Sequence, residues 1–334
     1  MPIFKRFNQE DIVRANPTEV TTGLWPDGSG QVQTFTIDTG QRDSRTGEFY
    51  LDVMDANGND LFSLAYGHVD GLGHPTLVQD ANSTLATKAT YAQYRNLLLD
   101  PSDERFTFAG GYSSDHIYVI NLQRSLIKER LDPGNWKIRL GNGVDTFTFV
   151  DDSGQAFGTA YGRSGKVFNI IAGDIGGPSG PTVVAEQSAN FGGFGLVYPS
   201  LGIIVLNPDA LTEYAGLDAP DTTASATPTR NYNILYDAIV AGGNFVARSS
   251  ENISSTHYFV RLRASEFNYT NNNTFFDDSN GDIIFSAFTQ DPRVYVTTVG
   301  LYNDNNELLA VAKMSQPIQK GFDRELNLKV RLDF

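Results

Sequence analysis

The last ten residues of the chain alternate between apolar and polar side chains without interruption. The apolar positions of this segment are Leu326, Leu328, Val330, Leu332 and Phe334. Side chains of a strand repeat every two residues, so all five fall on one face, whereas a helix would scatter them around its circumference. Residues 325–334 therefore predict a strand that closes a sheet or offers an edge to a neighbouring subunit.

A second pair of strands is predicted immediately before this terminal strand. Residues 294–302 are rich in β-branched and aromatic side chains, residues 303–306 (Asn-Asp-Asn-Asn) favour a turn, and residues 307–314 form another apolar run. A proline and a glycine interrupt the connection to the end of the chain. We therefore expect a three-stranded antiparallel meander over residues 294–334.

Short apolar runs separated by turn sequences recur along most of the chain. Hairpins are expected about residues 55–60 and 141–143, because Asn and Gly tolerate positive φ. Helical spacing is found in few places, which are residues 85–99, 125–131, 209–214 and 231–241. Further strands are predicted over residues 31–37, 116–122, 166–172, 195–206 and 256–263. The pattern predicts a mainly β protein with antiparallel, sandwich-like sheets and a few short helices.

The sequence suggests one boundary between two domains. Residues 173–181 (GDIGGPSGP) contain four glycines and two prolines, which disfavour both helix and ladder pairing. We predict an N-terminal β-rich domain over residues 1–172 and a C-terminal β-rich domain over residues 182–334, joined by this segment.

Composition narrows the functional classes. The 334 residues include 32 Gly, 15 Tyr and 22 Phe, which favours many strands joined by tight turns. The absence of cysteine excludes disulfides, thiolate zinc sites and a cysteine nucleophile. A net charge of −14 disfavours binding to nucleic acid. We find no apolar run long enough for a membrane span or a signal peptide, so we expect no membrane partner and synthesis in the cytoplasm of the producing cell.

Several motifs resemble ligand sites but lack required residues. His68, Asp70 and His74 match no zinc spacing. Residues 277–282 and 55–58 resemble calcium loops, yet neither has an acid at the first ligand position, so turns are expected at both. Residues 158–166 lack the first glycine and the final Ser or Thr of a phosphate loop. We therefore predict no metal, no cofactor and no catalytic residue, and a protein that is not an enzyme.

Aromatic residues are the stronger candidates for function. Phe191 and Phe194 are separated by two glycines, so they serve either as core residues or as exposed anchors for a neighbouring subunit. Together with Tyr302 and the apolar face of residues 325–334, they form the predicted interface set.

Five stretches of the chain resemble virion structural proteins of contractile-tailed phages, particularly those of cyanobacterial myoviruses. They are residues 65–68 (AYGH), 91–97 (YAQYRNL), 115–119 (DHIYV), 198–208 (YPSLGIIVLNP) and 300–310 (GLYNDNNELLA). The resemblance implies a non-enzymatic tail component, most similar to a baseplate wedge protein, with a neck or other tail-associated protein as the alternative. It also implies location in the virion tail after assembly in the host cytoplasm, and other tail or baseplate proteins as partners in a homo- or hetero-oligomer.

A different class of function is compatible with the same composition. Aromatic faces and loops rich in Asn and Asp also suit sugars, so a carbohydrate-binding β module is the second hypothesis. Glycan binding by the isolated chain would favour it, whereas oligomerisation with tail proteins would favour a structural subunit.

Overall fold

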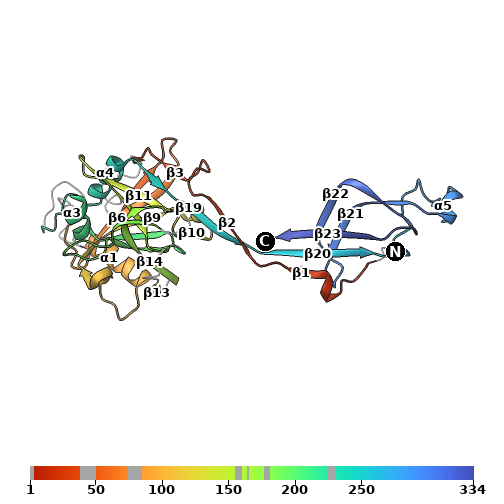
Figure 1. Ribbon diagram of the computed structural model, residues 1–334, viewed down its shortest axis with the longest axis horizontal. Helices are drawn as coiled ribbons and strands as arrows, with labels where there is room; N and C mark the ends of the chain where they lie inside the picture. Colours follow the sequence, from red (N-terminus) through yellow and green to blue (C-terminus); the bar gives the residue numbers. More distant parts are fainter. Residues whose placement is uncertain are drawn as a thin grey trace. The chain divides into compact units, whose positions relative to one another are not determined.

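The computed structural model describes residues 4–37, 50–73, 85–154, 160–163, 165–176, 181–223 and 231–334. The chain divides into two compact units (Figure 1): unit 1 comprises Met1–Thr18 and Asn252–Phe334, and unit 2 comprises Glu19–Glu251. The two ends of the chain thus fold together, and unit 2 is inserted between them. The predicted mainly β, antiparallel fold is confirmed.

The predicted domain boundary at residues 173–181 falls inside unit 2 rather than between the units. Strand β14 (Gly165–Asp174) ends at this segment and β15 (Thr182–Ala185) begins after it, and the two strands pair antiparallel. The segment rich in glycine and proline therefore connects two paired strands of unit 2. Residues 177–180 lie outside the described part of the chain.

Within the described residues, thirteen strands of unit 2 form one sheet (Figure 1). Its path runs β3 (Gln31–Val32), β18 (Phe245–Val246), β11 (Lys137–Gly141), β12 (Thr146–Asp151), β14, β16 (Gly195–Tyr198), β17 (Ile203–Leu206), β9 (His116–Leu122), β6 (Asp60–His68), β5 (Leu51–Met54) and β4 (Thr36–Ile37), while β13 (Ala160–Gly162) and β15 pair with β14. Only residues 33–35 separate the two end strands β3 and β4. Because so short a segment spans at most about 14 Å, the sheet must curl on itself.

Both faces of the central strands are buried. In β9, Tyr118, Ile120 and Leu122 belong to one hydrophobic cluster, whereas Ile117 and Val119 belong to another. The first cluster also takes in side chains of α3 (Pro208–Ala215) and α4 (Asn231–Gly242), and the second takes in those of α1 (Leu85–Leu98). Burial on two faces explains why this strand is an apolar run without alternation.

Smaller elements complete unit 2. Strand β19 (Arg248–Ile253) lies between β10 (Arg130–Leu131) and β2 (Thr18–Gly23), and β7 (Phe106–Phe108) pairs with β8 (Tyr112–Ser114). The short helices are α2 (Arg124–Ile127) and the 3-10 turn η2 (Ala109–Gly111). The predicted hairpins at residues 55–60 and 141–143 are confirmed, as are the helices at 209–214 and 231–241. The predicted strand over residues 31–37 is instead broken into β3 and β4.

Helix α1 packs unusually close to β6 because Gly67 has no side chain. A Cβ atom at Gly67 would lie 2.8 Å from the backbone nitrogen of Tyr91, a distance that neither backbone accommodates. We expect Gly67→Ala to destabilise unit 2 by about 1–3 kcal/mol, because α1 must move outward. Gly30→Ala is the matched control, since its nearest neighbour would be at 3.7 Å. Denaturant unfolding of both variants measures the difference, and equal stability would contradict this packing.

The described residues of unit 1 form one three-stranded sheet and one two-stranded ribbon. The sheet has the order β1 (Ile12–Arg14), β20 (Ser255–Leu262), β23 (Leu326–Asp333), and the ribbon pairs β21 (Val294–Tyr302) with β22 (Leu308–Lys320). Figure 1 shows β20 and β23 side by side. The short helices η1 (Gln9–Asp11) and α5 (Ala287–Gln290) complete the unit.

The terminal strand forms as predicted, but its partner differs. Val330 is buried and Leu326, Leu328 and Leu332 are half-buried, while the intervening polar residues are exposed. The predicted meander is wrong in its third strand: β23 pairs along its whole length with β20, not with β22. Their register sets apolar side chains opposite one another, with Tyr258, Val260 and Leu262 facing Val330, Leu328 and Leu326. Such cross-strand pairs stabilise a sheet.

Candidate protein interface

The outward face of the ribbon carries a group of exposed apolar side chains. Phe4, Tyr302, Leu308 and Val311, which we name the ribbon patch, are 48%, 45%, 52% and 56% exposed. The ring of Phe4 meets that of Tyr302 edge-on, with 4.9 Å between centroids. Gly300 lies opposite Val311, and a Cβ atom there would be 2.9 Å from the Tyr302 ring and 3.4 Å from Leu308. The four side chains are therefore neighbours on one surface.

The turn at the tip of the ribbon is tightly hydrogen-bonded. The side-chain oxygen of Asn303 accepts hydrogen bonds from the backbone N–H groups of Asn305 (3.0 Å) and Glu307 (2.8 Å). Tyr302 pairs with Leu308 while Leu301 pairs with Ala310, so Leu309 is an extra residue in a bulge and is 67% exposed. The turn and the bulge hold the exposed leucines on a fixed backbone.

The inward face of the ribbon forms part of the core of unit 1. Val294 and Leu301 are buried, and Val296, Val299 and Ala312 are half-buried. A two-stranded ribbon is only marginally stable by itself. With its inward face covered, its outward apolar face is the part that remains available to another molecule.

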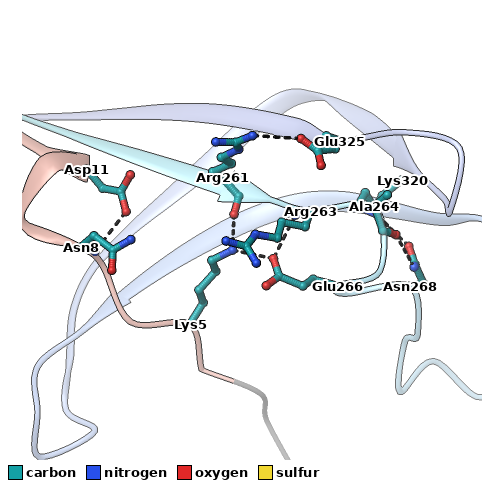
Figure 2. A network of polar contacts seen from close by, with 10 residues as sticks. All are labelled: Lys5, Asn8, Asp11, Arg261, Arg263, Ala264, Glu266, Asn268, Lys320 and Glu325. Atoms are coloured by element: carbon teal, nitrogen blue, oxygen red, sulfur yellow. Dashed lines mark hydrogen bonds and ion pairs between the residues drawn. The ribbon is translucent and has the colours of Figure 1, made fainter.

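A buried ammonium group fixes the base of the ribbon. The Nζ atom of Lys320 donates to the carbonyl oxygens of Ala264 (2.9 Å) and Gly321 (2.9 Å) and to the side-chain oxygen of Asn268 (2.8 Å). Figure 2 shows this group beside the loop that follows β20. Burial lowers the pKa of Lys320, against the attraction of surrounding carboxylates. The acceptors on Ala264 and Asn268 join the loop to the end of β22.

A second lysine holds the same loop from the other side. The Nζ atom of Lys5 lies 2.5 Å from a carboxylate oxygen of Glu266 and donates to the carbonyl oxygen of Arg261 (Figure 2). The other contact of the Glu266 carboxylate is the backbone N–H of Arg263, at 2.9 Å. The hydrogen bonds from Lys5 and Arg263 lower the pKa of Glu266, and the one from Lys5 has the larger effect. The N-terminal segment that supplies Phe4 to the ribbon patch is thereby attached to β20.

The negative charge of the protein is concentrated in unit 2. Unit 1 contains 11 Lys and Arg against 12 Asp and Glu, a net charge of −1, whereas unit 2 contains 14 against 27, a net charge of −13. Interface cores are depleted of charged residues, and high net charge opposes association. Charge distribution and exposed apolar surface therefore both favour unit 1 as the docking unit.

Seven of the eight predicted interface residues fall into three groups. Tyr302 is in the ribbon patch, and Phe334 is exposed at the end of the chain. Leu326, Leu328, Val330 and Leu332 face the interior of unit 1, so they support the unit rather than present a surface. Phe191 is half-buried and meets Tyr112 edge-on, with 5.5 Å between centroids.

Phe194 is a core residue, which corrects its place in the predicted interface. It is fully shielded from solvent, and its ring lies 4.8 Å from that of Tyr214 and 5.2 Å from that of Phe149. The sequence left open whether this residue is a core residue or an exposed anchor, and the structure shows that it is a core residue. Its position immediately before β16 turns the side chain into the curled sheet.

Sequence reasoning missed Phe4, Leu308 and Val311 as surface residues. A signal for two of them was present, because residues 308–312 (LLAVA) are apolar at consecutive positions and cannot all face one core. Phe4 carried no such signal, since its contact with Tyr302 joins opposite ends of the chain.

Unit 2 contains a buried polar cluster at the start of β9. The Nε2 atom of His116 lies 3.0 Å from one carboxylate oxygen of Asp209, and the hydroxyl of Tyr112 donates to the other at 2.8 Å. The Nδ1 atom of His116 lies 3.2 Å from the hydroxyl of Tyr66. His116 and Tyr66 are both buried, so the cluster joins β6, β8, β9 and α3.

We expect Asp209→Asn to destabilise unit 2 by about 1–3 kcal/mol, because an amide cannot accept both hydrogen bonds as a carboxylate does. Burial raises the pKa of Asp209, but the hydrogen bonds from His116 and Tyr112 outweigh it, so the pKa lies below 3.8. The ionised form is thus favoured in the folded state, and its stabilisation is present above pH 3.8 and lost at lower pH. The unfolding free energies of the wild type and of Asp209→Asn should therefore differ at pH 5 and become more similar at pH 3. The same difference at both pH values would contradict this role of the Asp209 carboxylate.

Within the described residues, the remaining sequence motifs do not assemble a ligand site. His74 lies outside the described residues, as do residues 158, 159 and 164 of the segment that resembles a phosphate loop. Among the residues that are described, no group of three His, Asp or Glu side chains is placed to hold a metal ion. Residues 277–282 form a turn, in which the N–H of Gly281 donates to the carbonyl oxygen of Asp277.

One shallow cavity of about 180 Å³ lies beside the hairpin of β5 and β6, with Trp25, Asp27 and Asp55 among its lining residues. The carboxylate of Asp55 already accepts hydrogen bonds from the backbone N–H groups of Asn57 and Asn59 and from the side chain of Asn59. The carboxylate of Asp55 is therefore used to close its own turn.

No helix in the described part of the chain is long and apolar enough to cross a membrane. No family model matches the chain, and no curated protein or solved structure matches it either.

Proposed function

We propose that the chain is a non-enzymatic structural subunit of a contractile phage tail, placed in the baseplate wedge, and that it docks to neighbouring subunits through the ribbon patch of unit 1. The observation that carries the proposal is an exposed apolar surface on a rigid hairpin in the unit whose net charge is close to zero. Residues 300–310, one of the stretches that resemble phage virion proteins, include the tip of this hairpin.

The ribbon patch contributes part of the interface in this proposal. Burying Tyr302, Leu308 and Val311 contributes about 1.5–3 kcal/mol for each side chain before costs are subtracted. Association of two proteins costs about 4–15 kcal/mol in lost translational and rotational freedom, so these side chains alone are insufficient. Within the described residues, β21 and β22 pair only with each other, which leaves backbone groups on both outer edges for strand addition.

Strand addition is confined to the half of β22 near the tip. Pro317 lacks an N–H group, and the ladder shifts register between the pairs Val296–Ile318 and Thr298–Lys313. Residues 310–313, between this shift and the bulge at Leu309, have no such interruption on their strand. The proposed contact therefore combines the ribbon patch with the adjacent backbone edge.

The proposal is tested by incorporation of variants into tail particles. L308D/V311D places two carboxylates in the ribbon patch and should reduce incorporation at least about tenfold, because burying unpaired charge costs more than 1.4 kcal/mol. The matched control is V144D/V184D, which makes the same kind of change at residues of unit 2 that are 89% and 75% exposed. Equal incorporation of both variants would contradict the proposal, and circular dichroism of each purified variant checks that it folds.

A carbohydrate-binding module remains the second hypothesis from the sequence. Both tryptophans, Trp25 and Trp136, are buried, so neither offers an exposed ring to a sugar. No specific observation in the described residues favours this hypothesis over docking. A glycan array probed with the purified chain tests it directly.

A further inference from the structure

His68 holds the turn that ends β6 through a hydrogen bond that requires a neutral ring. Its Nδ1 atom accepts from the backbone N–H of Asp70 at 3.1 Å, so this nitrogen carries a lone pair and no proton. The turn is closed further by the N–H of Gly71, which donates to the carbonyl oxygen of His68. The His68 side chain is buried, with 6% exposure for the residue.

The residues after this turn attach two helices to β6. The carbonyl oxygen of Leu72 accepts from the hydroxyl of Thr87 in α1 at 3.0 Å. The carbonyl oxygen of Gly73 accepts from the side-chain amide of Asn231 in α4 at 2.8 Å. A change in the turn is therefore transmitted to the contacts with α1 and α4.

The surroundings of His68 offer little compensation for a positive charge. His116 of β9 meets it edge-on, with 5.9 Å between ring centroids. The carboxylate of Asp115 is paired with Arg105 at 3.0 Å, and Asp70, in the turn itself, is exposed. The carboxylate of Asp209 is occupied by His116 and Tyr112.

The two neighbouring histidines differ in what protonation would do to them. His116 has Tyr66 at Nδ1 and Asp209 at Nε2, and both partners can accept from a charged ring, so it retains its contacts in either state. Protonation of His68 at Nδ1 places a proton against the N–H of Asp70 and breaks that hydrogen bond. Burial, with a smaller contribution from His116, lowers the pKa of His68 below 6.5, as expected for a ring held neutral by its site.

We propose that the turn of residues 68–71 is an acid-sensitive latch: protonation of His68 at Nδ1 releases the N–H of Asp70 and loosens the attachment of residues 72–73 to α1 and α4. The neutral form is the one that the fold favours. Its stabilisation is therefore complete above pH 6.5 and is lost as the pH falls through the folded pKa. The latch lies in unit 2 and is independent of the interface proposed for unit 1.

Hydrogen–deuterium exchange of the full chain tests the latch. After correction for the intrinsic pH dependence of exchange, protection of the Asp70 and Gly71 amides should fall between pH 7.5 and 5, by at most about tenfold per pH unit because one proton is taken up. In His68→Gln the amide oxygen can accept from Asp70 without titrating, so protection should stay constant. His257→Gln, which changes a histidine of unit 1, should behave as the wild type.

Two results would overturn the latch. One is constant protection of residues 70–71 in the wild type across this pH range, and the other is the same acid-dependent loss in His68→Gln. If that variant does not fold, NMR titration of the wild type decides the question, because the chain has only four histidines. The Asp70 amide shift must then follow the His68 ring with the same midpoint, and a different midpoint would contradict the proposal.

Discussion

Lys320→Met should destabilise unit 1 by about 1–3 kcal/mol. The substitution keeps most of the length of the side chain but removes its three hydrogen bonds. It leaves the side-chain oxygen of Asn268 unpaired, whereas the carbonyl oxygens of Ala264 and Gly321 still accept from Asn268 and from the N–H of Arg324. An unsatisfied buried acceptor costs about 1–3 kcal/mol, and relief from burying the ammonium offsets part of the total. Chemical denaturation monitored by a probe in unit 1 measures the effect.

The control for this substitution is Lys313→Met. Lys313 is on the outward face of β22 and is exposed, so the same change there should alter stability by less than about 0.5 kcal/mol. A Lys320→Met protein as stable as this control would show that the contacts of Lys320 with Ala264 and Asn268 do not hold the loop to the ribbon.

Phe194→Ala should destabilise unit 2 by about 3–5 kcal/mol, the usual cost of removing a fully buried phenylalanine. The lost ring contacts are those with Phe149 and Tyr214, and the side chain has no exposed surface. Denaturant unfolding followed by tryptophan fluorescence measures this loss, since both tryptophans are in the core of unit 2.

Phe191→Ala is the matched comparison, three positions away in the same glycine-rich run. Phe191 is half-buried and packs on Tyr112 at the border of the core, so we expect a cost of about 1–2 kcal/mol. If the two variants were equally stable, Phe194 would not have the core role that the structure assigns to it.

The elements that sequence patterns predicted correctly are local ones. The alternation of residues 325–334 fixes a strand with one inward face, and Asn-Gly between apolar runs fixes the hairpin at residues 55–60. Both signals depend on side-chain period and turn conformation, which are properties of a few adjacent residues. The fold class followed from the recurrence of such signals.

The pairing of strands that are far apart in the sequence could not be predicted from such local patterns. The partner of β23 is β20, some 70 residues earlier, and the segment 4–14 joins the same unit from the opposite end of the chain. Any of several alternating strands could have satisfied the apolar face of residues 325–334. The glycine- and proline-rich segment 173–181 gives the same composition whether it joins two domains or two paired strands.

Only part of the candidate interface could be predicted, because the rest depends on long-range packing. Tyr302 was identified from its residue type, but exposure of Leu308 and Val311 depends on which face of the ribbon is covered. Phe191 and Phe194 are equivalent by sequence, and only the position of β16 in the curled sheet separates them.

The most direct test of this account is imaging of assembled tail particles at a resolution that traces this chain. We predict that residues 300–311 are covered by a neighbouring subunit, with the ribbon patch buried and the edge of β22 in backbone contact with it. A particle in which this tip projects into solvent, or tails that do not contain the chain, would contradict the proposed function.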